Sequence, residues 1–283
     1  SRVRKPLLAR DTRLMAAALN SLGARLEEET DGWLVTPGEF AGPIEIDCGL
    51  AGTVMRFVPP VAALATGLVR FDGDPRARVR PMAGVIDALR QLGVVVHDDA
   101  RGTLPFTVEG VGTVRGGEVR IDASASSQFV SALLLAGARY AEGIHIVHEG
   151  GALPSLPHIE MSVEMLRARG VAVTADIASA THASWTVQPG AISALAEVVE
   201  PDLSNALPFI AAAMVTGGRV KIADWPAKTT QPGGQIPALL TQMGGSFTLD
   251  ESGLTCQGPS RMHGLEADLS EVGELTPVLA ALC

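Results

Sequence analysis

A repeated pattern of about 75 residues limits the fold of this chain more than any other feature of its sequence. An amphipathic stretch that ends at a glycine, followed by a strand, a turn and a second strand, occurs four times. The terminal glycines are Gly23, Gly93, Gly170 and Gly244, which lie 70, 77 and 74 residues apart. Glycine readily adopts the left-handed backbone conformation that ends many helices. The pattern therefore predicts four helices that each stop at one of these glycines.

A second block alternates with the first and consists of a short strand, a turn of small residues, a helix rich in Ala and Leu, and another strand. It begins near Ile44, Val119, Val198 and Glu266. One full unit thus reads βαβαββ, and strands that alternate with helices predict an α/β fold. We expect three units over residues 1–197, the first incomplete at its start, and part of a second domain over residues 198–283. From the phase of the repeat we also expect a fragment that lacks both termini.

Composition narrows the class of partner. Hydrophobic residues make up 47% of the chain and aromatic residues only 4%, which predicts a core of Ala, Val and Leu. A formal net charge of -9 and a single Tyr argue against nucleic acid, which requires a basic face and stacking rings. The three cysteines have no CxxC spacing, so neither a disulfide framework nor a thiolate zinc site is expected. We therefore expect a small-molecule partner.

No segment has the pattern of a membrane span or a secretory signal. The longest apolar stretches, residues 129–138 and 207–215, are shorter than the roughly 18 residues that a spanning helix requires. The first residues lack the pattern of a signal peptide. We therefore expect a cytoplasmic protein that does not bind a membrane.

Residues 122–136, DASASSQFVSALLLA, indicate an anion site. A strand runs through a serine-rich turn into an apolar helix, and Ser124, Ser126 and Ser127 lie near the helix start. Hydroxyls, free backbone N–H groups and the positive end of the helix dipole would converge there, which suits a phosphate or a carboxylate. An ordinary serine cap is the alternative reading. Because the units repeat, we expect equivalent helix starts near Gly52, Ser126, Ser204 and Glu274 to converge in pairs on a shared cleft.

Cationic and acidic residues next to other turns are further candidates. Alternation over residues 72–82 would place Arg76, Arg78 and Arg80 on one side of an extended segment, either as an anion clamp or as a solvated strand. Ser155 precedes a predicted helix, where it could simply be a cap. Glu274 lies at a helix start, as a capping acid or as a general base.

Patterns for nucleotides and metals are missing. The chain has no GxxxxGK[ST] and no HExxH sequence. His145 and His148 would point to opposite faces of one strand, so they do not form a metal pair. We expect no metal site and interpret both histidines as structural.

Six segments in order resemble 5-enolpyruvylshikimate-3-phosphate synthases, and the resemblance covers nearly all 283 residues. They are GLAGTVMRF, DPRARVRPMAGVIDALRQLG, DASASSQFVSALLLA, SLPHIEMSVEMLRARGV, VEPDLSNALPFIAAA and DLSEVGELTPVLAALC. The resemblance implies two domains, each of three βαβαββ units packed as an inside-out α/β barrel, with the site between them. It implies transfer of the enolpyruvyl group from phosphoenolpyruvate to the 5-hydroxyl of shikimate 3-phosphate, by a monomer that requires no cofactor.

The resemblance also implies roles for single residues. Ser126, Ser127 and Ser155 would bind shikimate 3-phosphate, and Gln128 would lie near both substrates. Glu274 stands where the family has an acidic residue, usually aspartate, that contacts the attacking hydroxyl and is a candidate proton acceptor.

Phosphoenolpyruvate would be held by the backbone at Gly52 and by Arg80, with Gln128 beside them. Leu50 and Phe57 stand where the family often has Asn and Pro. Cationic elements of the family that would lie before residue 1 and after residue 283 have no counterpart, so we expect the fragment itself to be inactive.

Two alternatives stay open. One is the related transferase that acts on UDP-N-acetylglucosamine, which typically has a reactive cysteine five residues before the position of the pair Arg80-Pro81. Here that residue is Pro75, which favours the shikimate substrate. The other is a non-catalytic module that binds phosphate ligands.

Overall fold

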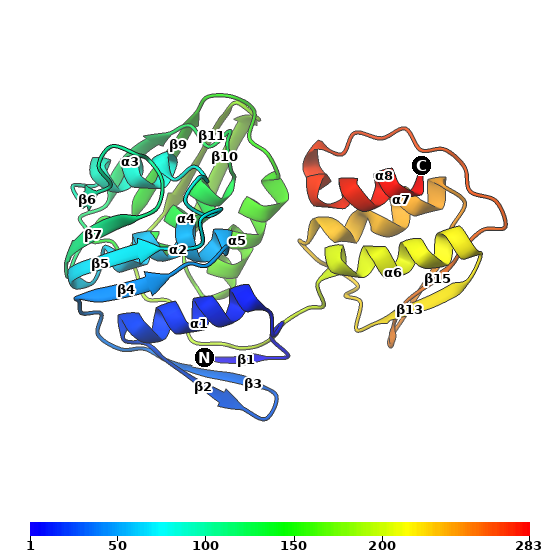
Figure 1. Cartoon of the computed structure of the whole chain (residues 1–283), viewed down its shortest axis with the longest axis horizontal. Coiled ribbons are helices and arrows are strands. Elements are labelled where there is room, and N and C mark those ends of the chain that lie inside the picture. Colours follow the sequence, from blue (N-terminus) through cyan, green and yellow to red (C-terminus); the bar gives the residue numbers. More distant parts are fainter. The chain divides into compact units, whose positions relative to one another are not determined.

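The computed structural model describes all 283 residues and divides them into two compact units. The first unit comprises Ser1–Pro154 and Ser162–Val198, and the second comprises Ser155–Met161 and Val199–Cys283. Figure 1 colours most of the first unit blue to green and most of the second yellow to red. Both units combine helices and sheets, as the alternating pattern predicted.

Two sheets of the first unit repeat one strand order. The first sheet consists of β4 (Ile44–Asp47), β5 (Thr66–Asp72), β7 (Phe106–Val111) and β6 (Val95–His97), in that spatial order. The second consists of β8 (Gly117–Ile121), β9 (Ile144–Glu149), β11 (His182–Val187) and β10 (Val173–Ser179). In both, the first two strands are parallel and the other pairs antiparallel, which confirms the predicted βαβαββ repeat.

A third sheet of the first unit is completed from the far end of that unit. Its strands are, in spatial order, β12 (Ala196–Val198), β1 (Arg2–Arg4), β3 (Gly32–Thr36) and β2 (Arg25–Glu29). Strand β12 runs parallel to β1. The sequence pattern predicted that Val198 begins a block of the second domain, and this is wrong for its strand. The open edge of β1 is paired by β12 instead, because unpaired backbone groups at a sheet edge gain hydrogen bonds from an added strand.

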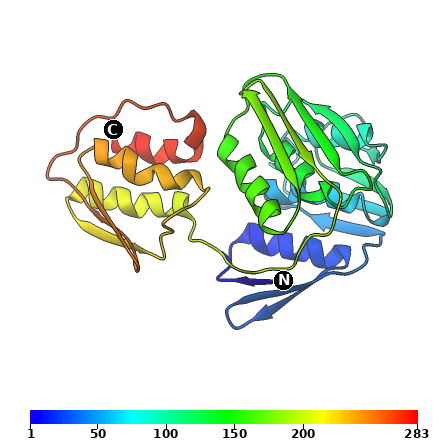
Figure 2. The ribbon, with the colours of Figure 1, turned by 180° about the vertical axis from the view of Figure 1, so that it is seen from behind.

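The helices of the first unit lie among these sheets. They are α1 (Arg10–Leu22), α2 (Gly52–Ala62), α3 (Ala83–Gln91), α4 (Gln128–Gly137) and α5 (Leu156–Ala168), whose first residues group with the second unit. Figures 1 and 2 show α2 and α4 inside the unit with the sheets outside. Helices α2 and α4 contact each other, and most of their residues are buried. Both begin at predicted helix starts, so these two starts converge within one unit.

The glycines that set the predicted period end their helices as expected. Gly23, Gly93, Gly170 and Gly244 all have positive φ, from 78° to 117°. At Gly23 the backbone N–H donates to the Asn20 carbonyl at the end of α1, so the left-handed residue closes the last turn.

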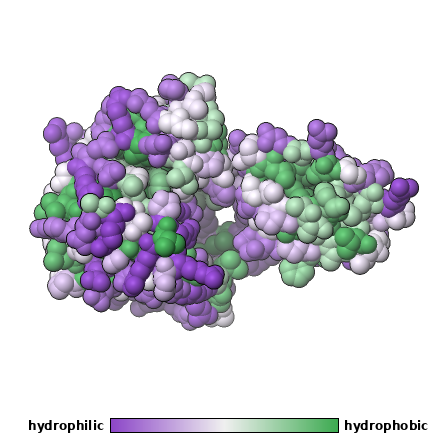
Figure 3. Space-filling model, turned by 45° about the horizontal axis from the view of Figure 1, so that its top comes forward, coloured by the Kyte–Doolittle hydropathy of each residue, from purple (hydrophilic) through white to green (hydrophobic).

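The second unit has one three-stranded sheet with its own core. Its elements are α6 (Leu203–Thr216), β13 (Arg219–Ala223), η1 (Pro232–Gln235), α7 (Ile236–Gln242), β14 (Ser246–Asp250), β15 (Gly253–Gln257), η2 (Ser270–Leu275) and α8 (Thr276–Leu282). The strand order is β13-β15-β14. Buried side chains of α6, α7, α8 and β15 form one cluster. Phe209 and Val215 of α6 stay exposed, and Figure 3 shows apolar surface on this unit.

None of the helices combines the length and apolar character that a bilayer-crossing helix requires.

Candidate active site

The serines in the turn between β8 and α4 differ in their hydrogen bonds. The Ser124 N–H donates to Asp122 Oδ1 at 2.9 Å. Hydrogen bonds from the Ser124 hydroxyl and N–H hold the pKa of Asp122 below its usual value. Ser124 therefore closes a local turn and does not lie at the helix start, contrary to the sequence prediction.

Ser126 and Ser127 directly precede α4. The Gln128 N–H lies 3.3 Å from Ser126 Oγ, and the Phe129 N–H donates to the Ser126 carbonyl. The predicted free N–H groups of the first helical turn are thus partly occupied. Ser127 is at the N-cap position, but its hydroxyl makes no capping hydrogen bond, although the residue is only 6% exposed. The simple capping alternative is therefore wrong for Ser127, whose hydroxyl can serve a ligand.

The arginine segment forms turns instead of an extended strand. The Ala77 N–H donates to the Asp74 carbonyl at 2.8 Å, and the Arg80 N–H donates to the Ala77 carbonyl at 3.0 Å. Because these turns break the alternation, the predicted clamp of three arginines is wrong. Arg78 instead makes two hydrogen bonds of 2.8 and 2.9 Å to Asp72.

Arg80 reaches the start of α2. Its Nη1 donates to the Leu50 carbonyl at 2.8 Å. A Cβ added to Gly52 would lie 2.6 Å from Arg80 Nη2 and 3.2 Å from Gln128 Oε1. Glycine is therefore required at this position if both side chains are to approach the first turn of α2. The structure thus brings together three predicted residues, Gly52, Arg80 and Gln128, from three separate segments.

Arg56 completes this cluster, and the sequence analysis did not assign it a role. It lies one helical turn after Gly52 on α2 and is 5% exposed. Its Nη1 donates to Gln128 Oε1 at 2.8 Å, and its Nη2 lies 3.4 Å from the Pro81 carbonyl oxygen. The guanidinium carbon lies 5.3 Å from the ring centre of Phe129, while Nε is buried without a partner.

Arg56 and Arg80 form a pair of positive charges that lack a carboxylate partner. Burial and, to a smaller extent, the positive charge of Arg80 together lower the pKa of Arg56 to about 10. A buried cation without a counterion is unfavourable, so this position is a candidate site for an anion that neutralises it. The sequence signal that could have identified Arg56 is a lone charge within the apolar helix GTVMRFVPPVA.

The other predicted site residues, Ser155 and Glu274, belong to the second unit. Ser155 precedes α5 with a left-handed φ of 53°, and its carbonyl accepts the His158 N–H at 3.0 Å. Glu274 lies in η2, directly before α8. Within the first unit, the structure brings together the predicted residues Gly52, Arg80 and Gln128.

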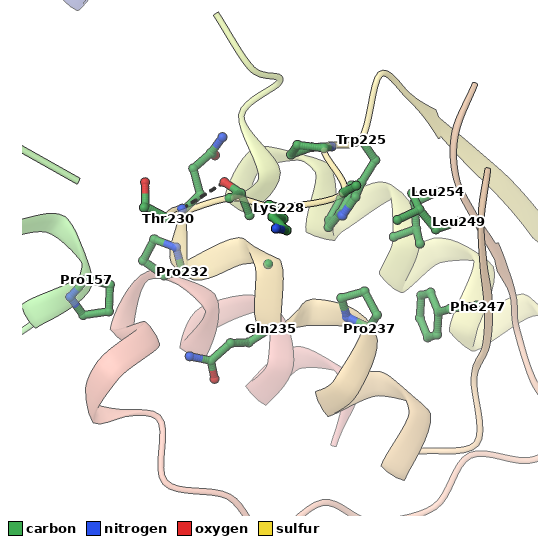
Figure 4. A pocket seen from close by; sticks show the side chains of 15 residues that line it. Pro157, Trp225, Lys228, Thr230, Pro232, Gln235, Pro237, Phe247, Leu249 and Leu254 are labelled. Carbon is green, nitrogen blue, oxygen red and sulfur yellow. Dashed lines mark hydrogen bonds between the residues drawn. The ribbon is translucent and has the colours of Figure 1, made fainter. Parts of the chain in front are cut away.

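The second unit also contains a cavity of about 640 Å³, shown in Figure 4. Its lining includes Trp225 and Pro237, with Phe247, Leu249 and Leu254 along the sheet. Two of its polar lining residues, Thr229 and Gln231, already make hydrogen bonds within the protein. The Thr229 hydroxyl and the Gln231 amide donate to Glu200 Oε2 at 2.6 and 2.8 Å. We therefore assign no ligand to this cavity.

Comparison with known sequences decides the family. The sequence profile of the family described as EPSP synthase (3-phosphoshikimate 1-carboxyvinyltransferase) matches residues 1–283. This chain belongs to the EPSP synthase family. A 3-phosphoshikimate 1-carboxyvinyltransferase of Kocuria rhizophila is 52% identical over 299 residues, which cover all of this chain and 65% of that relative. The chain thus spans somewhat less than two thirds of the length of this curated relative.

Solved structures of family members and related transferases have the same fold. The EPSP synthase of Acinetobacter baumannii matches with a TM-score of 0.76 at 22% identity, over 99% of this chain and 63% of that one. The enolpyruvyl transferase NikO of Streptomyces tendae matches with a TM-score of 0.68 at 15% identity, over 99% and 66% of the respective chains. These matches confirm the predicted inside-out α/β barrel fold.

Proposed function

We propose that this chain takes part in the transfer of the enolpyruvyl group from phosphoenolpyruvate to the 5-hydroxyl of shikimate 3-phosphate, a step of aromatic amino acid biosynthesis. The observation that carries the proposal is the pair of buried Arg56 and partly exposed Arg80, which has no carboxylate partner and lies beside Gly52 and Gln128. Phosphoenolpyruvate has a phosphate and a carboxylate, and guanidinium groups bind both with paired hydrogen bonds.

The serines supply the second half of the proposed site. The hydroxyls of Ser126 and Ser127, at the positive end of α4, bind the phosphate of shikimate 3-phosphate. Ser155 assists at the same phosphate, and Gln128 lies between the two substrates. Glu274 accepts the proton of the attacking hydroxyl as general base.

The proposed chemistry needs acid-base groups and neutralisation of charge. The 5-hydroxyl loses its proton as its oxygen adds to C2 of phosphoenolpyruvate, and C3 takes up a proton. Elimination then removes phosphate from C2 together with a proton from C3, which restores the double bond. Positive groups held in place before the reaction stabilise the charge that develops. We propose no metal or organic cofactor, a monomer, and a cytoplasmic location. We further propose that the second unit is part of another domain built from the same repeat.

A chimera tests this function directly. The 283 residues replace the matching segment of the Kocuria rhizophila relative, which supplies the remaining 35% of its own length. We expect the chimera to release phosphate from phosphoenolpyruvate only when shikimate 3-phosphate is present. A folded chimera that does not catalyse this transfer, or that accepts UDP-N-acetylglucosamine instead, contradicts the proposal.

Ser127→Ala should weaken binding of shikimate 3-phosphate by about 1–3 kcal/mol, because a hydrogen bond to a charged group is lost. The hydroxyl of Ser127 makes no capping hydrogen bond whose loss would confuse the result. Isothermal titration calorimetry of the purified chain measures the change. Ser193→Ala, in an exposed loop of the first unit, is the control and should bind as the unmodified chain does. Equal affinity of the Ser127 variant would count against the assignment.

Gly52→Ala should weaken binding of phosphoenolpyruvate, by about tenfold, with little change in stability. The added methyl group would lie 2.6 Å from Arg80 Nη2, so the guanidinium must move away from the helix start. Titration of the chain with phosphoenolpyruvate, together with thermal unfolding, separates the two effects. The control is Gly190→Ala, because a Cβ at Gly190 would meet no atom within 4 Å. Gly93→Ala is unsuitable, because the φ of 81° at Gly93 disfavours alanine. Unchanged affinity in Gly52→Ala would place the ligand elsewhere.

A further inference from the structure

A buried imidazole joins two loops of the first unit. His148 is 0% exposed on β9. Its Nδ1 lies 3.2 Å from the Ala123 nitrogen and its Nε2 lies 3.0 Å from the Gly151 carbonyl oxygen. A backbone N–H can only donate and a carbonyl can only accept. The ring must therefore carry its single proton on Nε2 and present a bare Nδ1 to Ala123.

The two loops that the ring joins are those that lead into the proposed phosphate-binding serines. The Ala123 carbonyl accepts the Ser126 N–H at 3.0 Å, so the residue that His148 holds also sets the position of Ser126. Gly151 begins the short run of chain that ends at Ser155. His148 thus contacts both segments without reaching the solvent.

The two loops that His148 joins also pack closely against each other. A Cβ on Gly150 would lie 2.4 Å from the Asp122 carboxylate, and one on Gly151 would lie 3.0 Å from Ser124 Cβ. Glycines therefore allow the loops to touch, and the imidazole supplies the polar bridge between them. A backbone N–H that is buried without a partner is costly, so the ring also satisfies the Ala123 donor.

We propose that His148 is a positioning residue for binding of shikimate 3-phosphate, acting through the Ala123 N–H to hold Ser126 and Ser127 in place for its phosphate. The inference rests on the proposed function. His148 does not touch the substrate, because the ring is fully buried. Its Nδ1 lone pair is the group that matters for the serine turn, while Nε2 anchors the neighbouring loop.

Three substitutions separate these two contacts. His148→Asn keeps an acceptor near the position of Nδ1 and loses the link to Gly151. His148→Gln keeps a polar group near Nε2 and loses the acceptor for Ala123, and His148→Phe loses both. The matched control is His145→Phe on the same strand, which removes a 2.9 Å contact between His145 Nδ1 and Thr186 Oγ1 and leaves the serine turn untouched.

Calorimetry of the full chain with shikimate 3-phosphate, well below the unfolding temperature, is the first measurement. We expect His148→Phe and His148→Gln to bind about tenfold more weakly, the factor for one lost hydrogen bond. His148→Asn and His145→Phe should retain the affinity within about threefold. Loss of affinity in the Asn variant equal to that in the Phe variant would indicate a purely structural role and overturn the inference.

Nitrogen NMR of the same chain tests the hydrogen bonds of the His148 ring without any ligand. The unmodified chain should show one protonated and one bare nitrogen for His148, and His148→Phe should shift the Ser126 and Ser127 amide signals. If His148→Phe does not fold, the comparison of the Asn and Gln variants decides. Unmoved serine amide signals, or equal affinity in all variants, overturn the inference. Failure of the unmodified chain to bind would instead count against the proposed function.

Discussion

Replacing Arg56 by methionine is expected to increase the stability of the free chain while removing most of its affinity for phosphoenolpyruvate. The guanidinium is almost fully buried and lacks a carboxylate partner, and its Nε has no hydrogen-bond acceptor. Burial disfavours the charged form of the guanidinium, and together with the charge of Arg80 it lowers the pKa to about 10. Methionine fills a similar volume without a charge, and such replacements of buried charges are often stabilising, by about 1–4 kcal/mol.

The loss of affinity has two physical causes. The variant lacks one of two positive charges at the proposed phosphoenolpyruvate site, and Gln128 loses the 2.8 Å hydrogen bond that orients its amide. A hydrogen bond to a charged group contributes about 1.5–3 kcal/mol, so we expect affinity to fall by about 10- to 100-fold or more. Calorimetry with phosphoenolpyruvate and urea unfolding of the chain measure the two quantities.

Arg76→Met is the matched control, because Arg76 is exposed in the same first unit and makes no ion pair. It should change neither stability nor affinity appreciably. If Arg56→Met unfolds more easily than the unmodified chain and still binds phosphoenolpyruvate normally, then Arg56 is a structural residue.

Asp98→Asn is expected to cause the largest loss of stability in the first unit, about 2–4 kcal/mol. Asp98 is 2% exposed and accepts hydrogen bonds from Arg90 at 2.6 Å, from the Gly102 N–H at 2.8 Å and from the Ala100 N–H at 3.1 Å. The amide keeps the size of the side chain, but it removes the charge that faces Arg90 and turns one acceptor into a donor.

The same carboxylate predicts a dependence of stability on pH. Burial by itself raises the pKa of Asp98, but hydrogen bonds from Gly102, Arg90 and Ala100 outweigh it and hold the pKa below its usual value. A lowered pKa contributes stability above the unfolded value of about 4, and this contribution is lost as pH falls through the folded pKa. The difference in unfolding free energy between Asp98→Asn and the unmodified chain should therefore shrink in acid.

The neighbouring Asp99 supplies the control for this prediction. Its side chain is 81% exposed and pairs only with Arg101, so Asp99→Asn should change stability by less than about 1 kcal/mol. Urea unfolding near neutral pH and near pH 3 would test both variants. A gap between Asp98→Asn and the unmodified chain that widens in acid would contradict the assigned direction of the pKa.

Local patterns in the sequence predicted much of the fold correctly. Gly23 and Gly93 end helices because a left-handed residue is a local requirement, and the nearby residues are sufficient to show it. The βαβαββ order follows from hydrophobic periodicity, which is also local. The prediction was wrong for the arginine segment, because the turn that starts at Asp74 removes the alternation that the residue types suggested.

In the candidate site, too, some features could be predicted from the local sequence and others could not. The family resemblance implied that the backbone at Gly52 holds phosphoenolpyruvate, and the structure brings Arg80 and Gln128 to that helix start. The role of Arg56 was not predictable in the same way, because the environment of a buried charge depends on side chains from distant segments. Its partners, Gln128 and the Pro81 carbonyl, lie 72 and 25 residues away in the chain.

The sequence by itself determined the repeat, the helix ends, and the place where a serine turn meets a helix, because each depends on the preferences of neighbouring residues. Only the tertiary structure decided that β12 pairs with β1, and that buried Arg56 lies close to Arg80 without a counterion. Pairing at a sheet edge and the electrostatic environment of a charge depend on which distant segments meet, and many segments of similar local pattern could meet there.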